Sequence, residues 1–153
     1  MFSSIADLLT FVSIMVAIVF GIIGYRQNQL AQKKSHTVNL LENFSSNETL
    51  ATADFQMTRL INNDKKLDGY EIEDETDSYV INLLDYYEFL ATSYIHGVLN
   101  QDILLHIRGG AMSRAHFVCE KYIDDRRKML NAPNLYRNYE NLVIEYRRRD
   151  MGL

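Results

Sequence analysis

The sequence predicts an all-α protein with one membrane-spanning helix at its N-terminus. Residues 8–25 read LLTFVSIMVAIVFGIIGY, eighteen positions without a charged side chain, and about 20 mostly apolar residues are needed to cross a bilayer. Downstream, apolar residues recur in steps of three and four, which is the period of a helix. No stretch alternates as a strand does, and the 153 residues include only one proline. We therefore expect a long transmembrane helix that continues into a small helical bundle.

The charges beside the apolar run predict its orientation. Asp7 precedes the run, whereas Arg26, Lys33 and Lys34 follow it. Because positive residues favour the cytoplasmic side, we expect a single-pass protein of a bacterial inner membrane, with the N-terminus periplasmic and the C-terminal domain cytoplasmic. A cleaved signal peptide and a buried core helix of a soluble protein are the alternatives. The run lacks the basic residues that precede the apolar core of a signal peptide.

The chain divides into three parts on this interpretation. Residues 1–26 form the transmembrane helix, residues 27–44 a helical continuation or linker, and residues 45–153 the cytosolic helical bundle domain. Ser45 and Glu48 stand at the spacing of a capping box, which predicts a new helix there. The continuation carries a narrow apolar seam of Leu30, Val38, Leu41 and Phe44.

Four helices are expected in the bundle. The first follows Ser45 and ends near Asp68-Gly69, the second lies between Asp77 and Gly97, and the third starts at a cap, Asn100 or Asp102. Gly109-Gly110 interrupts the third helix and indicates a kink or close packing. Pro133 is expected to open the last helix. The residues predicted to face inward are Leu50, Ala53 or Asp54, Met57, Leu60, Ile61, Val80, Leu83, Leu84, Tyr87, Leu90, Ala91, Tyr94, Val98, Ile103, Leu104, Ile107, Ala111, Ala115, Val118, Cys119, Tyr122, Leu135, Tyr139, Leu142, Val143 and Tyr146.

Charge is distributed unevenly along the bundle. Residues 64–102 hold ten acids and two bases, whereas residues 103–153 hold ten bases and six acids. Such halves can pair within one subunit or between neighbouring subunits. The net charge of −4 argues against a DNA-binding protein, since nucleic-acid binding favours a strongly basic face.

Small and weakly polar residues form a stripe along the predicted span. Their steps of three and four average the turn of an α-helix, so they share one side of it. Helices associate in lipid through close backbone approach at small residues and through hydrogen bonds. The stripe therefore predicts self-association into a homo-oligomer, and a polar path through the membrane is the stronger form of that prediction. Its members are Thr10, Ser13, Ala17, Gly21, Gly24 and Asn28.

No motif for a metal or another cofactor is present in the sequence. The four histidines lack the ligand spacing of a metal site, and we expect no cofactor. One predicted helix carries Arg108, Arg114 and His116, which are the residue types of one class of RNase active site. RNases of the higher-eukaryote-and-prokaryote nucleotide-binding kind carry an Arg a few residues before a His. Here Arg108 precedes His116 by eight residues and Arg114 precedes it by two, so the three residues are at most a degenerate nuclease-like set.

Three segments carry a resemblance to a family. The segments Asp85-Tyr86-Tyr87-Glu88-Phe89-Leu90-Ala91 and Tyr94-Ile95-His96-Gly97-Val98-Leu99, with Pro133-Asn134-Leu135-Tyr136, resemble an uncharacterised family of short bacterial and prophage proteins. Those proteins have one N-terminal span and a small cytosolic helical domain. In layout the chain is also similar to the accessory membrane pore proteins of type VI-B CRISPR systems. That similarity implies a ring-shaped pore in antiviral defence, with an RNA-guided effector as a possible partner.

The sequence therefore predicts a non-enzymatic, self-assembling membrane protein. Its partners would be membrane lipid and copies of itself. Two alternatives stay open: a membrane-tethered module that binds a cytosolic protein through a domain starting near Ser45, and an RNase that uses His116.

Overall fold

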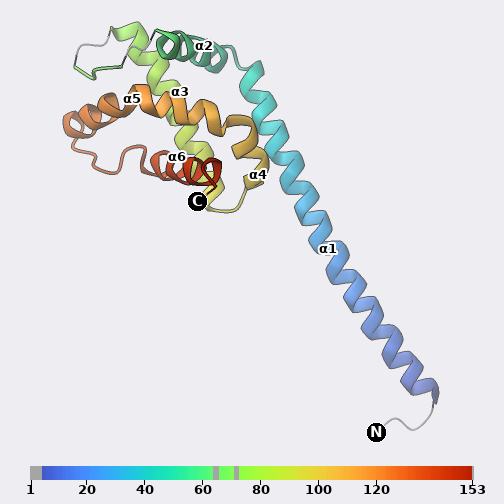
Figure 1. Ribbon diagram of the computed structural model, residues 1–153. Helices are drawn as coiled ribbons and strands as arrows, with labels where there is room; N and C mark the ends of the chain where they lie inside the picture. The colour runs from blue at the N-terminus through green and yellow to red at the C-terminus, as the bar shows by residue number, and fades with distance from the viewer. Residues whose placement is uncertain (1–4, 64–65, 71–72, 153) are drawn as a thin grey trace.

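The computed structural model describes residues 5–63, 66–70 and 73–152, which form helices and the turns between them, without a strand (Figure 1). The all-α prediction is confirmed. Residues 1–4 of the predicted transmembrane part lie outside the described residues. The elements in chain order are α1 (Ile5–Ser46), α2 (Glu48–Asn62), α3 (Asp74–Ile95), α4 (Gln101–Leu104), the π-helical turn η1 (Leu105–Gly109), α5 (Gly110–Met129) and α6 (Arg137–Asp150).

Helix α1 is one continuous rod, and only its C-terminal end packs against the bundle (Figure 1). Phe44 and Leu41 are buried in the core, whereas Val38 and Leu30 of the predicted seam are exposed. Thr37 is fully buried; its Oγ1 donates to the Lys33 carbonyl at 2.7 Å and accepts the Asn100 N–H at 2.8 Å. The bundle therefore includes the last turns of α1, within the segment that the sequence assigned to a linker.

Three helix boundaries differ from the sequence predictions. Ser45 lies inside α1, so it cannot cap α2; Asn47 is the cap instead, and its side chain accepts the Leu50 N–H at 3.1 Å. Helix α2 ends at Asn62, well before Asp68-Gly69. Helix α6 begins at Arg137, because the chain after Pro133 forms turns and Tyr136 adopts a left-handed conformation with φ 57°. Asn100, one of the two caps predicted for the third helix, is confirmed.

Helix α3 lies at the centre of the bundle and contacts α2 and α6. Its predicted inward residues are buried, with one exception beyond its end. Val98 is 47% exposed, because α3 ends at Ile95 and the chain turns at Gly97, which has φ +66°. The prediction for Val98 was therefore wrong. The α3 residues in the core are Val80, Leu83, Leu84, Tyr87, Leu90, Ala91 and Tyr94.

The π-helical turn η1 changes which residues face the core. A π turn inserts an extra residue into the helix and rotates the residues that follow. As a result Leu105 and Gly109 are buried, whereas Ile107, predicted to face inward, is 52% exposed. Gly109 packs so closely on Tyr146 that an added Cβ would lie 2.3 Å from its ring. The close packing predicted at the glycine pair is thus present at its first member.

The acidic and basic halves of the bundle pair within one chain. Lys121 pairs with Asp68, and Arg126 lies 3.6 Å from Asp77. Arg149 likewise lies 3.6 Å from Asp102. These three pairs join residues 64–102 to residues 103–153, so the intramolecular form of the charge prediction is present. The same charges are less available for contacts between neighbouring subunits.

Candidate functional site

The most unusual surface of the protein is the apolar N-terminal half of α1, residues 8–25, which we call the exposed half of α1. Every residue from Leu8 to His36 is exposed, and the most apolar window of the helix has a mean hydropathy of 2.4 with none of it buried. By length and composition this is the one candidate membrane span among the described residues. A core helix would be covered by the rest of the chain, and this segment is not. Large exposed apolar surfaces are typical of contacts with a membrane or with another protein.

The small-residue stripe is open along this rod. Helix α1 is unbroken from Thr10 to Asn28, so the six stripe residues share one side as expected. The Ser13 hydroxyl donates to the Leu9 carbonyl at 2.9 Å, which satisfies its hydrogen within the helix. A Cβ added to Gly21 or Gly24 would meet nothing within 4 Å. The backbone at both glycines is therefore accessible to another helix.

Arg108 joins the rod to the bundle. Its Nη1 lies 3.2 Å from Asp54 Oδ2 on α2, and its guanidinium lies 3.9 Å from the centre of the Phe44 ring at the end of α1. The Tyr87 hydroxyl donates to Asp54 Oδ1 at 3.4 Å. Burial and the Asp54 charge raise the pKa of Tyr87. Arg108 therefore holds α1, α2 and η1 together, with its side chain 14% exposed.

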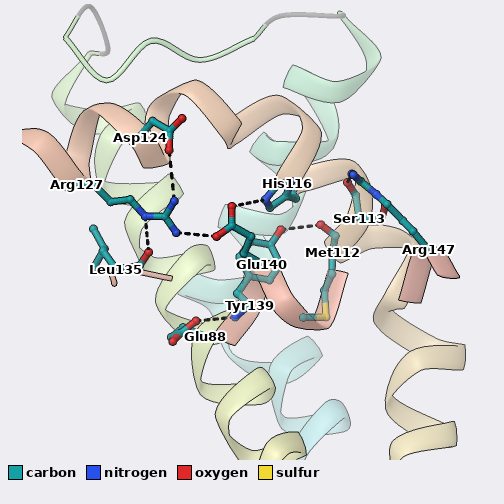
Figure 2. Close-up of polar contacts among 10 residues, drawn as sticks. All are labelled: Glu88, Met112, Ser113, His116, Asp124, Arg127, Leu135, Tyr139, Glu140 and Arg147. Carbon is teal, nitrogen blue, oxygen red and sulfur yellow. Dashed lines mark hydrogen bonds and ion pairs between the residues drawn. The ribbon is translucent and has the colours of Figure 1, made fainter. Parts of the chain in front are cut away.

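His116 lies in a polar network between α5 and α6 (Figure 2). Its Nε2 is 4.0 Å from Glu140 Oε1, and its ring meets the Tyr139 ring edge-on with centroids 5.7 Å apart. Burial lowers the pKa of His116 and the Arg147 charge lowers it further, while Glu140 opposes them. The imidazole is therefore neutral at pH 7, and its approach to Glu140 is a contact rather than an ion pair.

Arg127 is the centre of this network. Its Nη2 donates to Glu140 at 3.0 Å and its Nε donates to the Leu135 carbonyl at 3.0 Å, as Figure 2 shows. At the start of α6, Glu88 accepts the Tyr139 N–H at 2.8 Å, which satisfies a donor that the helix leaves unpaired. These contacts fix the α5–α6 connection on α3. The geometry is that of a structural network, with every bond made inside the protein.

The structure does not bring Arg108, Arg114 and His116 together. Arg108 contacts Asp54 and Phe44, while His116 contacts Tyr139 and Glu140. Arg114 is exposed and lines two cavities on the surface of the bundle. Sequence reasoning missed the partners, Asp54, Glu88 and Arg127, because nothing local to those residues indicates which distant side chain they meet.

Metal ligands do not gather in the part of the chain that the structure describes. No group of three or more His, Cys, Asp or Glu side chains there could hold an ion. Cys119 is fully buried, and burial raises the pKa of its thiol to about 12. Its environment is that of a small core residue rather than a reactive thiol.

The buried His116 predicts a pH dependence of stability. Its folded pKa lies below the ordinary value of 6.5, so the unfolded chain binds the proton first as pH falls, and folding loses free energy from pH 6.5 downward. The variant His116→Gln should lose less free energy of unfolding than the wild type between pH 7 and pH 5, measured by denaturant titration. The variant His106→Gln, which changes an exposed histidine, is the control for the substitution itself. Equal slopes for His116→Gln and wild type would contradict the assignment.

Comparison with known proteins places the chain in a family. The family described as "Domain of unknown function (DUF4760)" matches residues 11–146. The chain belongs to the DUF4760 family. The matched DUF4760 region begins inside the apolar part of α1 and ends in α6, so the exposed rod and the bundle together make up the family's domain. No curated protein and no solved structure matches the chain significantly. The similarity of layout to CRISPR accessory proteins therefore stays an expectation.

Proposed function

We propose that this DUF4760 protein is a single-span membrane protein that assembles with copies of itself through α1. The observation that carries the proposal is the apolar half of that helix, which the rest of the described chain leaves uncovered. The Arg26, Lys33 and Lys34 side chains follow the span, which supports a cytoplasmic bundle and a periplasmic N-terminus. The continuity of α1 into the bundle favours a retained anchor over a cleaved signal peptide.

Self-association is supported by the form of the exposed face. Lipid offers helices little hydrophobic reason to associate, so contacts between spans depend on close approach and on hydrogen bonds. Gly21 and Gly24 leave the backbone open on one side, with Thr10, Ser13, Ala17 and Asn28 along the same line. The opposite side carries bulky apolar residues such as Val12 and Val19, about half exposed. One side of the rod thus suits another helix and the other suits lipid.

Large side chains at the two glycines test the assembly. The double variant Gly21→Leu/Gly24→Leu should keep the fold of the monomer, because both sites have open space, and should shift the population from oligomer to monomer. The mass of the protein in mild detergent, from light scattering coupled to size exclusion, gives the readout. We expect a loss of at least about tenfold in association constant, a cost of about 1.4 kcal/mol.

The matched control enlarges side chains on the other side of the same helix. The double variant Val12→Leu/Val19→Leu enlarges two side chains opposite the stripe and should leave the mass of the assembly unchanged. An assembly that survives the glycine variant intact, or that the valine variant disrupts equally, would be incompatible with the stripe as the contact.

The proposal extends to a channel through the membrane that conducts small solutes. If the stripe faces the centre of a ring rather than one neighbour, its hydroxyls and the Asn28 amide would line a polar channel. Release of a small dye from liposomes that contain the purified protein tests this step. The role in antiviral defence rests on the similarity of layout alone, and survival of phage-challenged cells that express the protein tests it.

A further inference from the structure

A cavity on the bundle gathers three positive side chains. Lys66, Arg114 and Arg147 line a cavity of about 220 Å³ beside α5, together with Ser113 and Phe117. None of the described residues that line it is acidic. The cations come from three separate places: the chain after α2, α5 itself and the last turns of α6. Folding therefore brings them together in a protein whose net charge is −4.

These three cations have no carboxylate partner among the described residues, whereas six other cations of the bundle do. Arg108, Lys121, Arg126, Arg127, Lys128 and Arg149 each pair with an Asp or a Glu. The cations of the cavity instead contact neutral groups: Arg147 contacts Ser113, and the Lys66 ammonium lies 4.5 Å from the centre of the Phe117 ring. Like charges placed together without counter-charges destabilise a fold unless an anion binds them.

The Arg147 side chain and the backbone next to Lys66 are held in position. Arg147 Nε donates to Ser113 Oγ at 2.9 Å and Nη2 donates to the Ser113 carbonyl at 3.1 Å, a contact that Figure 2 shows. Among the described residues, no hydrogen bond from Nη1 accompanies these two. Next to Lys66, the Leu67 N–H donates to the Val118 carbonyl at 3.1 Å, which fixes that segment on α5. Pre-positioned donors of this kind favour binding because little order is lost when an anion arrives.

The dimensions indicate more than an inorganic ion. The cavity has the volume of roughly seven water molecules, and its other walls are Ile61, Val118 and Phe117, whose ring the Lys66 ammonium covers. A second cavity of about 260 Å³ shares Ile61 and Arg114 with the first and is lined by the polar side chains of Asp54, Thr58 and Asn62. A cationic cavity with an adjoining polar chamber fits a phosphate attached to a polar organic body.

We propose that this paired cavity is a nucleotide site, with Lys66, Arg114 and Arg147 around the phosphate and the nucleoside in the chamber lined by Asp54, Thr58 and Asn62. Arg114 can bind phosphate oxygens through two parallel hydrogen bonds, which supplies both affinity and geometry. Arg147 offers Nη1 alone, because Ser113 accepts hydrogen bonds from its Nε and Nη2. The site lies on the bundle, away from the exposed half of α1. It therefore adds a small-molecule ligand to the proposed membrane assembly and does not depend on that assembly.

Calorimetry on the full chain in detergent tests the site with AMP, ADP and ATP as probes. Adenosine and inorganic phosphate separate the two chambers, and soluble dihexanoyl phosphatidylglycerol tests a lipid headgroup as the source of the phosphate. We expect at least one nucleotide to bind more tightly than either fragment. Lys66→Gln/Arg114→Gln, which changes two exposed side chains, should weaken that binding by at least about tenfold.

Arg148→Gln is the matched control, because Arg148 is exposed and adjacent to Arg147 but does not line the cavity. It should leave nucleotide affinity unchanged. The proposal is overturned if no nucleotide binds, if the double variant binds as tightly as the wild type, or if only the lipid phosphate binds. Light scattering on the same samples reports the oligomer separately, so loss of the nucleotide site and loss of self-association can be distinguished.

Discussion

A fragment that begins at residue 45 is expected to be largely unfolded, whereas one that begins at residue 29 folds. The shorter fragment lacks Leu41 and Phe44, which are 6% and 2% exposed in the core. Loss of a buried Leu or Phe side chain costs about 2–5 kcal/mol each, and a domain of this size has about 5–15 kcal/mol in total. Arg108 also loses the Phe44 ring on which it stacks.

Urea titration followed by circular dichroism compares the two fragments. We expect a cooperative transition for residues 29–153 and a much lower midpoint, or none, for residues 45–153. The single variant Phe44→Ala in the longer fragment should lower the free energy of unfolding by about 3–5 kcal/mol. It should therefore account for part of the difference between the two fragments. Equal midpoints for the two fragments would show that the end of α1 is a linker after all.

The second large effect is expected at the glycine pair of η1 and α5. A Cβ on Gly109 would lie 2.3 Å and 2.5 Å from two ring carbons of Tyr146 and 3.0 Å from Cγ, so the whole ring has to move. Gly109→Ala should therefore cost about 1–3 kcal/mol or more through overpacking. A Cβ on Gly110 meets its nearest atoms at 3.5 Å, in a helical conformation with φ −64°. Gly110→Ala should be neutral or stabilise by about 0.4–1 kcal/mol.

Each substitution is the control for the other, because both replace Gly by Ala and they lie at adjacent positions. The free energy of unfolding of each variant in the 29–153 fragment gives the comparison. A smaller Tyr146 side chain should relieve the first substitution, so Gly109→Ala/Tyr146→Leu should unfold at a higher urea concentration than expected from the two single changes. Similar costs at both glycines would refute the close approach of Gly109 and Tyr146.

Much of the fold could be predicted because helices leave a local record in the sequence. The steps of three and four in α3 predicted its buried face, and the apolar run predicted the N-terminal part of the 42-residue helix α1. Predictions from local sequence patterns were wrong where the helix boundaries and helix type depend on the rest of the fold. The π turn at η1 exposed Ile107 because a single inserted residue rotates the face, and no sequence signal marks such a turn. Asn47, not Ser45, caps α2 because α1 continues through Ser45.

The candidate sites were less predictable than the fold. The stripe on α1 was visible because its residues share one helix. The paired cavity was not, because Lys66, Arg114 and Arg147 come from three segments that only folding brings together. Asp54 appeared in the sequence as one of two candidates for a core position, and in the structure it binds Arg108 and Tyr87. Partners of this kind follow from tertiary packing and leave no local pattern.

The central claim is that the exposed half of α1 lies in a lipid bilayer. Alkaline carbonate extraction of membranes from cells that express the full chain tests it most directly, with intact mass measured on the same fractions. We predict that the full-length protein stays in the membrane pellet at its complete mass, while the fragment 29–153 is released into the supernatant. Recovery of the full-length chain in the soluble fraction, with residues 1–28 still attached, would contradict the claim.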